Sequence, residues 1–144
     1  MTGGCACGCV RFVAEVASDA AYLCHCRMCQ RATGSVSIAF VTLKHSNVEW
    51  QGAPDWYASS PIARRPFCSR CGTSLGFAYL DSDKIDLTVA AFDDPGFFRP
   101  TAHFGVESRL DAWWHATEGL PEQRADGYAS LNDRWAQAEA SPPA

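Results

Sequence analysis

Cys24-His25-Cys26-Arg27-Met28-Cys29 places three thiols within six residues of the chain. Thiolate sulfur is a soft metal ligand, and a turn of the backbone after Cys26 brings all three sulfurs within reach of one ion. Residues two apart in an extended segment point the same way, so Cys24 and Cys26 share a face and His25 points away. We therefore expect the three cysteines to bind a metal, with His25 as the alternative ligand.

Two further pairs of cysteines flank this central group. Cys5 and Cys7 precede it, and Cys68 and Cys71 follow it. A structural zinc site is closed by four protein ligands, whereas a catalytic site takes three and keeps a position for water or substrate. The sequence therefore predicts two zinc ions per chain, one closed by the outer pairs and one held by the central group with an open position.

An eighth cysteine, Cys9, stands outside this four-plus-three scheme. If the chain stays extended, Cys9 shares a face with Cys5 and Cys7 and competes for the closed site. If the chain turns at Gly8, Cys9 can instead complete the central group as a second closed site. An unpaired cysteine also packs as a small hydrophobic residue. We expect this third outcome, because the alternation from Val10 onward suits an inward-facing strand.

Length and composition indicate one globular domain and argue against nucleic acid and membranes as partners. The chain has 144 residues, of which 47% are hydrophobic and 19% charged, and such a composition is typical of a folded protein. The formal net charge is −4, and thiolate ligands add to it, so the basic surface of a nucleic-acid-binding protein is not expected. No stretch approaches the ~20 apolar residues of a membrane span.

The start of the chain, Met1-Thr2-Gly3-Gly4-Cys5, lacks the basic and apolar regions of a signal peptide. We therefore expect a cytoplasmic protein. Reducing conditions there keep cysteines as thiols, so eight of them indicate metal ligands rather than disulfides.

Hydrophobic alternation predicts a mainly β-sheet fold, because a period of two marks half-buried strands. A short helical turn is expected from Arg27 to Thr33, ending at Gly34. The segment 97–121 is aromatic and irregular, and we expect it to wrap over the sheets. Strands are expected at residues 10–16, 20–23, 36–43, 48–50, 56–57, 63–67, 75–80 and 84–92.

Helical spacing of apolar residues after Asp126 predicts a C-terminal helix. We divide the chain into a zinc-binding domain over residues 1–125 and a C-terminal helix with a frayed tail over residues 126–144.

Three motifs together resemble the glutathione-dependent formaldehyde-activating family, which also includes centromere protein V. The resemblance runs from about Gly3 to Pro121. It implies twisted antiparallel sheets knitted by zinc, similar to the fold of the B-type methionine sulfoxide reductases. The motifs are Gly4-Cys5-Ala6-Cys7-Gly8, Cys24-His25-Cys26-Arg27-Met28-Cys29 and Arg65-Pro66-Phe67-Cys68-Ser69-Arg70-Cys71-Gly72-Thr73.

The resemblance also implies a division of the metal ligands that agrees with ligand counting. The residues implied for the structural zinc are Cys5, Cys7, Cys68 and Cys71. Those implied for the second, substrate-facing zinc are Cys24, Cys26 and Cys29.

The family's named reaction joins glutathione to formaldehyde and gives S-hydroxymethylglutathione, so the resemblance implies a zinc-dependent carbon–sulfur lyase with glutathione as co-substrate. Zinc lowers the pKa of a bound thiol, which is near 8.5 when free, and so prepares the sulfur for attack. The alternative is a non-catalytic binding domain in which both zincs are structural.

We predict the substrate contacts other than the metal from the charges of nearby side chains. Three thiolates leave the central site at −1, and nearby arginines would offset this charge and suit the carboxylates of glutathione. The candidates are Arg27, Arg31, Arg64 and Arg65, of which we assign Arg65 to substrate binding; solvated surface charge is the alternative for all four. His103 and His115 lie where an acid or base for the adduct's proton would sit, and a structural or exposed histidine is the alternative for each.

Overall fold

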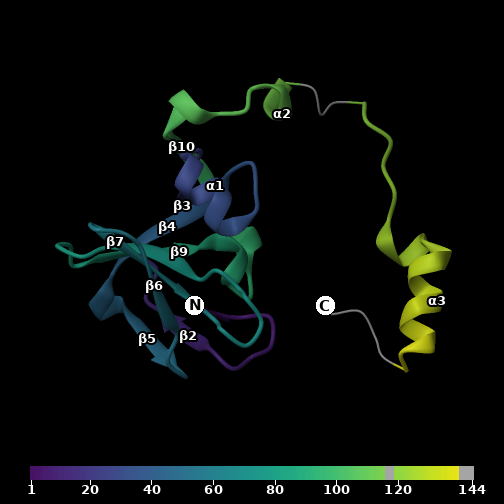
Figure 1. Ribbon diagram of the computed structural model, residues 1–144, viewed down its shortest axis with the longest axis horizontal. Helices are drawn as coiled ribbons and strands as arrows, with labels where there is room; N and C mark the ends of the chain where they lie inside the picture. Colours follow the sequence, from purple (N-terminus) through teal and green to yellow (C-terminus); the bar gives the residue numbers. More distant parts are fainter. Residues whose placement is uncertain (116–118, 140–144) are drawn as a thin grey trace. The chain divides into compact units, whose positions relative to one another are not determined.

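The computed structural model describes residues 1–115 and 119–139 and confirms a mainly β-sheet fold (Figure 1). Its described strands form a three-stranded sheet, in the order β1-β2-β5, and a seven-stranded sheet, in the order β10-β3-β4-β9-β8-β7-β6. The strands are β1 Thr2–Gly4, β2 Arg11–Ala14, β3 Ala20–Cys24, β4 Ile38–Lys44, β5 Val48–Gln51, β6 Asp55–Ser60, β7 Ala63–Phe67, β8 Gly76–Tyr79, β9 Lys84–Thr88 and β10 Arg99–Phe104.

Both sheets belong to a compact unit over Met1–Leu110, and a second unit begins at Asp111, earlier than residue 125. The second unit contains helix α2, Ala112–His115, and helix α3, Ala129–Gln137. Helix α3 confirms the predicted C-terminal helix. The expected frayed tail at residues 141–144 lies outside the described residues.

The core of the first unit follows the alternation of its strands. In β2, Phe12 and Ala14 are buried, and the Phe12 ring meets the Phe92 ring edge to face with centroids 5.0 Å apart. In β9, Ile85 and Leu87 are fully buried. Burying a side chain of this size contributes roughly 1.5–3 kcal/mol, so this packed layer gives the sheets their rigidity.

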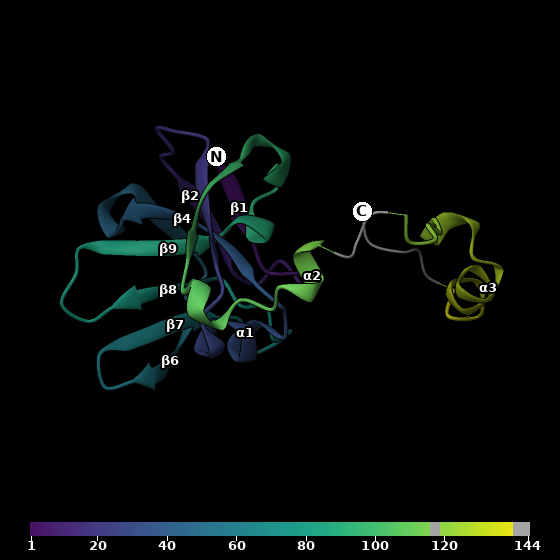
Figure 2. The ribbon, with the colours of Figure 1, turned by 90° about the horizontal axis from the view of Figure 1, so that it is seen from above.

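Strand β9 ends earlier than the sequence predicts. Alternation suggested a strand to residue 92, but β9 stops at Thr88 and a 3₁₀ turn, Val89–Ala91, follows. Strands β9, β8, β7 and β6 then lie side by side, as Figure 2 shows. Within this layer Asp86 faces Thr42 of β4 on one side and Phe77 of β8 on the other.

The segment 97–121, predicted to be irregular, contains the edge strand β10. It pairs in parallel with β3, and Phe104 lies opposite Cys24 in the register. The prediction was wrong because all six residues of β10 are exposed, and a strand without a buried face leaves no alternation to detect. The consequence for the site is that His103 and Phe104 lie beside the cysteines of the central group.

The short helix α1, Arg27–Thr33, confirms the predicted helical turn. Cys26 is its N-cap, and the Cys26 sulfur accepts a hydrogen bond from the Cys29 backbone N–H at 3.4 Å. The helix ends at Gly34, whose φ is 66°. The buried Gln30 side chain donates to the His25 carbonyl oxygen at 2.7 Å, which holds the helix against the end of β3.

Candidate metal centres and adjoining pocket

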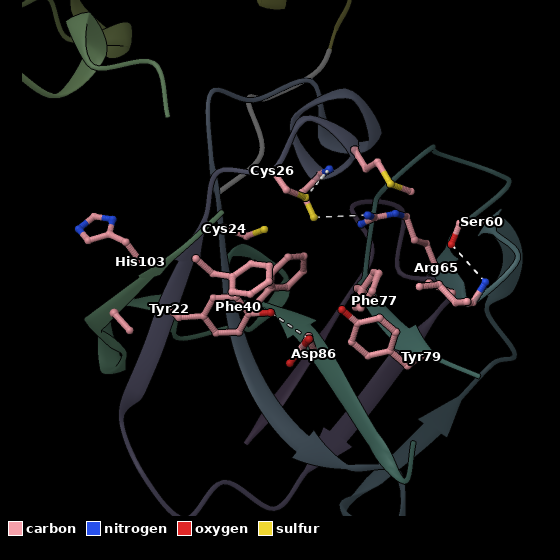
Figure 3. Close-up of a pocket in the computed structure, with 16 residues that line it drawn as sticks. Tyr22, Cys24, Cys26, Phe40, Ser60, Arg65, Phe77, Tyr79, Asp86 and His103 are labelled. Carbon is pink, nitrogen blue, oxygen red and sulfur yellow. Dashed lines mark hydrogen bonds between the residues drawn. The ribbon is translucent and has the colours of Figure 1, made fainter. Parts of the chain in front are cut away.

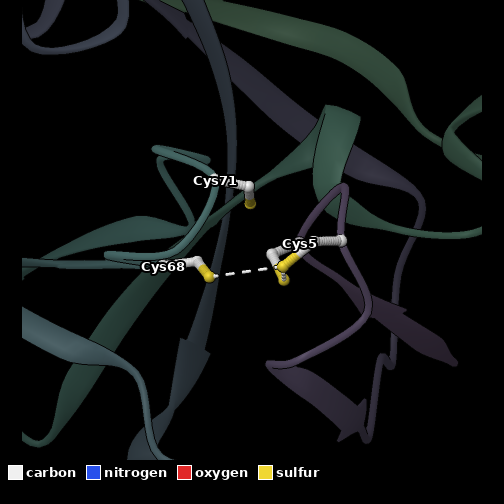
Figure 4. A group of neighbouring side chains, drawn as sticks. Cys5, Cys68 and Cys71 are labelled. Atoms are coloured by element: carbon white, nitrogen blue, oxygen red, sulfur yellow. Dashed lines mark hydrogen bonds between the residues drawn. The ribbon is translucent and has the colours of Figure 1, made fainter.

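The outer cysteine pairs meet in space, although Cys7 and Cys68 are 61 residues apart in the chain. The sulfurs of Cys5, Cys7, Cys68 and Cys71 lie within 4.8 Å of one another (Figure 4). Cys7 Sγ is 3.5 Å from Cys5 Sγ and 3.8 Å from Cys68 Sγ. Sulfurs about 2.3 Å from a tetrahedral zinc stand roughly 3.8 Å apart, so this donor set is close to the arrangement that a zinc ion requires.

Two matching turns present these thiols. The Gly72 N–H donates to the Cys68 carbonyl at 2.7 Å, and the Cys68 N–H donates to the Thr73 carbonyl at 3.0 Å. Gly72 has φ +77°, a conformation that side chains disfavour. The Ala6 N–H reaches the Thr73 hydroxyl at 3.1 Å and so joins the two turns. A hydrogen bond from that hydroxyl is the main cause that lowers the pKa of the Cys71 thiol to about 5, which favours the thiolate form that metals bind.

The central group forms at the junction of β3 and α1. Cys24 ends the strand, Cys26 caps the helix and Cys29 lies in its first turn, and their three sulfurs fall within 4.8 Å of one another. The pKa of the Cys29 thiol is lowered to about 5, first by a hydrogen bond with Cys24 and then by Arg65. The Nη2 of Arg65 is 3.3 Å from Cys29 Sγ. Three converging thiols of this kind offer three ligands and one open position.

His25 is fully buried and turns towards β10. Its Nε2 lies 2.9 Å from His103 Nδ1, and the two rings are stacked with centroids 5.1 Å apart. The His25 backbone N–H also donates to the Phe104 carbonyl at 2.8 Å. Gly105 makes this approach possible, because a Cβ there would meet the Cys26 backbone nitrogen at 2.9 Å.

Cys9 does not pack inward as predicted. It is exposed, and the Arg70 Nη1 donates to its sulfur at 2.9 Å. The chain turns at Gly8, where φ is +76°, and Val10 takes the buried position that begins the inward face. Among the described cysteines, Cys9 lies outside both groups whose sulfurs converge.

We predict that Cys9→Ala keeps the metal content and thermal stability of the parent protein, with a change within about 0.5 kcal/mol because the site is exposed. Zinc analysis and a thermal melt measure this directly. Loss of one zinc from the variant would show that Cys9 is a ligand.

A cavity of about 480 Å³ adjoins the central group (Figure 3). Its walls come largely from the seven-stranded sheet, whose strands contribute one to three residues each. Nothing in the sequence predicted this pocket. Alternation in β9 predicts that Asp86 lies on the opposite face of the sheet from Ile85 and Leu87. It does not predict that other parts of the chain enclose a pocket on that opposite face. The wall residues of the sheet include Tyr22 of β3, Phe40 of β4, Asp86 of β9, Phe77 of β8 and Arg65 of β7.

Arg65 is the one of the four candidate arginines that lines the cavity. Its side chain is buried, and the guanidinium carbon lies 4.9 Å from the centroid of the Phe77 ring. Among the described atoms, its Nε and Nη1 are buried without a hydrogen-bond partner. An unsatisfied buried donor costs about 1–3 kcal/mol, so these groups point to an acceptor supplied by a ligand.

The other three arginines are exposed and lie elsewhere. Arg27 donates to the Gln30 side chain, and the Arg64 guanidinium stacks on Trp56 at 4.2 Å. Arg31 does not line the cavity.

The carboxylate of Asp86 lies at the pocket wall and is hydrogen-bonded on both oxygens. The Tyr22 hydroxyl donates at 2.9 Å and the Thr42 hydroxyl at 2.5 Å. Burial raises the pKa of Asp86, although both hydroxyls oppose the shift. His103 also lines the cavity, whereas the side chain of His115 lies outside the described residues.

Three comparisons with known proteins bear on this arrangement. The model of a family described as "Glutathione-dependent formaldehyde-activating enzyme" matches residues 1–108. A protein of Schizosaccharomyces pombe named an uncharacterized lyase is 35% identical over 77 residues, which cover 54% of this chain and 56% of the relative. The chain therefore matches little more than half of that relative's length.

A crystal structure of a Rhodobacter sphaeroides protein shares the fold, with a TM-score of 0.56 and 22% sequence identity. The match covers 72% of this chain and 99% of that protein. In the part of our structure that is described, no helix is long and apolar enough to cross a membrane.

The family match spans both cysteine groups, the strands that carry the pocket and Arg65. The chain therefore belongs to the glutathione-dependent formaldehyde-activating enzyme family.

Proposed function

We propose that the protein is a cytoplasmic, zinc-dependent carbon–sulfur lyase that joins glutathione, or a similar thiol, to formaldehyde or another small electrophile. The observation that carries this proposal is the position of the three-thiol group, which borders a cavity of about 480 Å³. A site with three protein ligands next to a cavity suits catalysis, whereas a closed four-ligand site suits structure. The pocket thus favours the enzyme over a domain with two structural zincs.

In this proposal Cys5, Cys7, Cys68 and Cys71 hold a structural zinc. Cys24, Cys26 and Cys29 hold the second ion, which when bound lowers the pKa of a substrate thiol.

The residues around the central group bind and orient the thiol. Arg65 offers two buried N–H donors that lack a partner among the described atoms, and an arginine suits a carboxylate through paired hydrogen bonds. Glutathione carries such groups. Arg65 also places a positive charge 3.3 Å from the Cys29 sulfur, which offsets the negative charge of three thiolates.

The proposed reaction needs no oxidant or reductant. The thiol sulfur bonds to the carbonyl carbon, and the carbon–oxygen π pair moves to oxygen. The proton released by the thiol completes the hydroxyl group of the adduct. The His103 ring is held against His25 and points away from the central cysteines (Figure 3), so we do not assign the transfer of that proton to His103.

The direct test is to measure adduct exchange between glutathione and ¹³C-formaldehyde by NMR, with zinc-loaded protein and with buffer alone. The adduct also forms without catalyst, so the exchange rate is the informative quantity. We expect the protein to accelerate it in proportion to its concentration. Protein that carries two zincs and leaves the rate unchanged would instead support the non-catalytic binding domain.

We predict two zinc ions per chain in protein prepared without chelator. Seven of the eight thiols lie in two converging groups without a disulfide, and such groups favour a bound cation. Elemental analysis together with thiol titration tests the number. One zinc or none, with most thiols reactive, would contradict it.

A separate prediction concerns Arg65→Met, which keeps the length of the side chain but removes its charge and donors. We expect the KM for glutathione to rise about 10- to 100-fold, because a charged hydrogen bond contributes about 1.5–3 kcal/mol. The rise should be much smaller with 2-mercaptoethanol, which has no carboxylate.

Arg64→Met is the matched control, since its guanidinium stacks on Trp56 and does not line the cavity. It should leave both KM values unchanged. An equal effect of Arg65→Met on both thiols, in protein with normal zinc content, would show that Arg65 does not bind the carboxylate.

A further inference from the structure

The cavity is far larger than formaldehyde requires. A one-carbon aldehyde is little larger than water, whose share of liquid volume is about 30 Å³, whereas the cavity measures about 480 Å³. Pockets of this size accommodate molecules with many heavy atoms. Either the thiol or the electrophile must therefore fill the remaining space if the pocket is to exclude water.

The walls favour an apolar occupant. Tyr22 lies at the centre of a row of rings that come from neighbouring strands. Its ring centroid is 5.7 Å from that of Phe40 and 6.4 Å from that of Phe104. On the other side of the cavity, the rings of Phe77 and Tyr79 meet edge to face at 4.8 Å. Rings at these distances make a continuous aromatic surface, which prefers to contact another ring or an alkyl chain.

The rim of the cavity is also apolar. Four large side chains line it while remaining open to solvent: Met28, Ile62, Tyr79 and Phe104, with exposed fractions of 47%, 64%, 44% and 57%. Exposed apolar side chains that gather around one opening mark a binding site for an apolar group. Single exposed hydrophobic residues elsewhere would carry no such meaning.

The polar groups of the wall leave little for a charged peptide to bind. Both carboxylate oxygens of Asp86 already accept hydrogen bonds from Tyr22 and Thr42. Arg65 is the one Lys or Arg side chain among the described lining residues. Glutathione carries two carboxylates and an ammonium group, so this cavity satisfies at most one of its carboxylates. The aromatic part of the cavity is then left for the electrophile.

We propose that the electrophile carries an apolar body about the size of a benzene ring, which lies between the aromatic walls while its carbonyl carbon faces the central cysteine group. The substrate class is thus aryl or alkyl aldehydes rather than formaldehyde alone. This inference rests on the proposed thiol-adduct chemistry. The thiol sulfur bonds to the aldehyde carbon, the π pair moves to oxygen, and the thiol proton completes the hydroxyl group of a hemithioacetal.

Equilibrium binding tests the inference independently of turnover. S-Benzylglutathione and S-methylglutathione differ only in the group on sulfur, so their affinities for the zinc-loaded full chain compare an aryl with a one-carbon body. We expect the benzyl compound to bind at least about tenfold more tightly, because a buried ring removes much apolar surface from water. Calorimetry measures both affinities.

Two variants locate the benzyl group. Ala102→Trp adds a ring to a lining position that pairs with Tyr22, and it should remove most of the preference for benzyl. Ile62→Ser should reduce the preference severalfold by removing an apolar rim contact. Leu80→Ser is the matched control, because Leu80 is 59% exposed but does not line the cavity; it should keep the full preference.

The possible failures are distinguishable. Equal affinity for the two compounds would overturn the inference and leave glutathione recognition intact. A benzyl preference that both Ala102→Trp and Ile62→Ser retain would place the ring elsewhere and also overturn it. If neither compound binds, glutathione is not the thiol, and benzyl mercaptan is compared with 2-mercaptoethanol instead. Absence of a benzyl preference there would reject the apolar site itself.

Discussion

Cys71→Ser is expected to destabilise the folded protein by at least about 3 kcal/mol, or to prevent folding altogether. Cys71 is exposed, so serine removes almost no buried apolar surface. What it removes is one of the four sulfurs that lie within 4.8 Å of one another. Because a structural zinc site does not preexist in the unfolded chain, the energy of metal binding becomes energy of folding.

The topology explains why this effect should be large. The group of Cys5, Cys7, Cys68 and Cys71 joins two turns, and Cys7 and Cys68 are 61 positions apart in the chain. The ion binds only when these distant segments meet in the folded protein, so losing it removes stabilisation from the folded state alone. Urea denaturation of parent and variant, with zinc content determined in parallel, measures the change in the free energy of unfolding.

Cys9→Ser is the matched control for this experiment. Cys9 is an exposed cysteine in the turn that carries Cys5 and Cys7, but it lies outside the converging sulfurs, so its replacement should leave the midpoint unchanged. If Cys71→Ser unfolded at the same urea concentration as Cys9→Ser, with one zinc lost, the closed group would not be structural.

Cys26→Ser is expected to reduce turnover by about 10³-fold or more while the protein stays folded. The central group spans six residues, so a metal ion there closes almost no loop and contributes little to folding. Serine is also a good N-cap. It can keep the hydrogen bond to the Cys29 N–H that Cys26 now makes at 3.4 Å, so the substitution removes the metal ligand without removing the cap of α1.

Three measurements check this prediction: the NMR exchange rate, the zinc content and the urea midpoint. We expect one zinc in place of two, loss of the accelerated exchange and a midpoint close to that of the parent. A midpoint that falls as far as in Cys71→Ser would show that the central group also stabilises the fold, which contradicts the separate structural and catalytic roles of the two cysteine groups.

The grouping of the cysteines could be predicted from their spacing alone. Three thiols within six residues can converge after one turn, and the helix that makes the turn ends at the predicted Gly34. The two outer pairs share one local feature, which is a tight turn with glycine after the second cysteine. Such features depend on contacts between residues close in sequence, so local geometry nearly determines them.

The sequence by itself thus determined the two converging cysteine groups and most of the strands, because sulfur spacing and alternating burial are local properties. Only the tertiary structure decided the pocket. Arg65 and Asp86 face one cavity because β7, β8 and β9 are neighbours in the sheet. The sequence of a single strand does not indicate which strands will pair with it. Strand β10 was missed and Cys9 misplaced for a related reason: pairing and turning depend on distant neighbours, and exposed residues carry no alternation to reveal them.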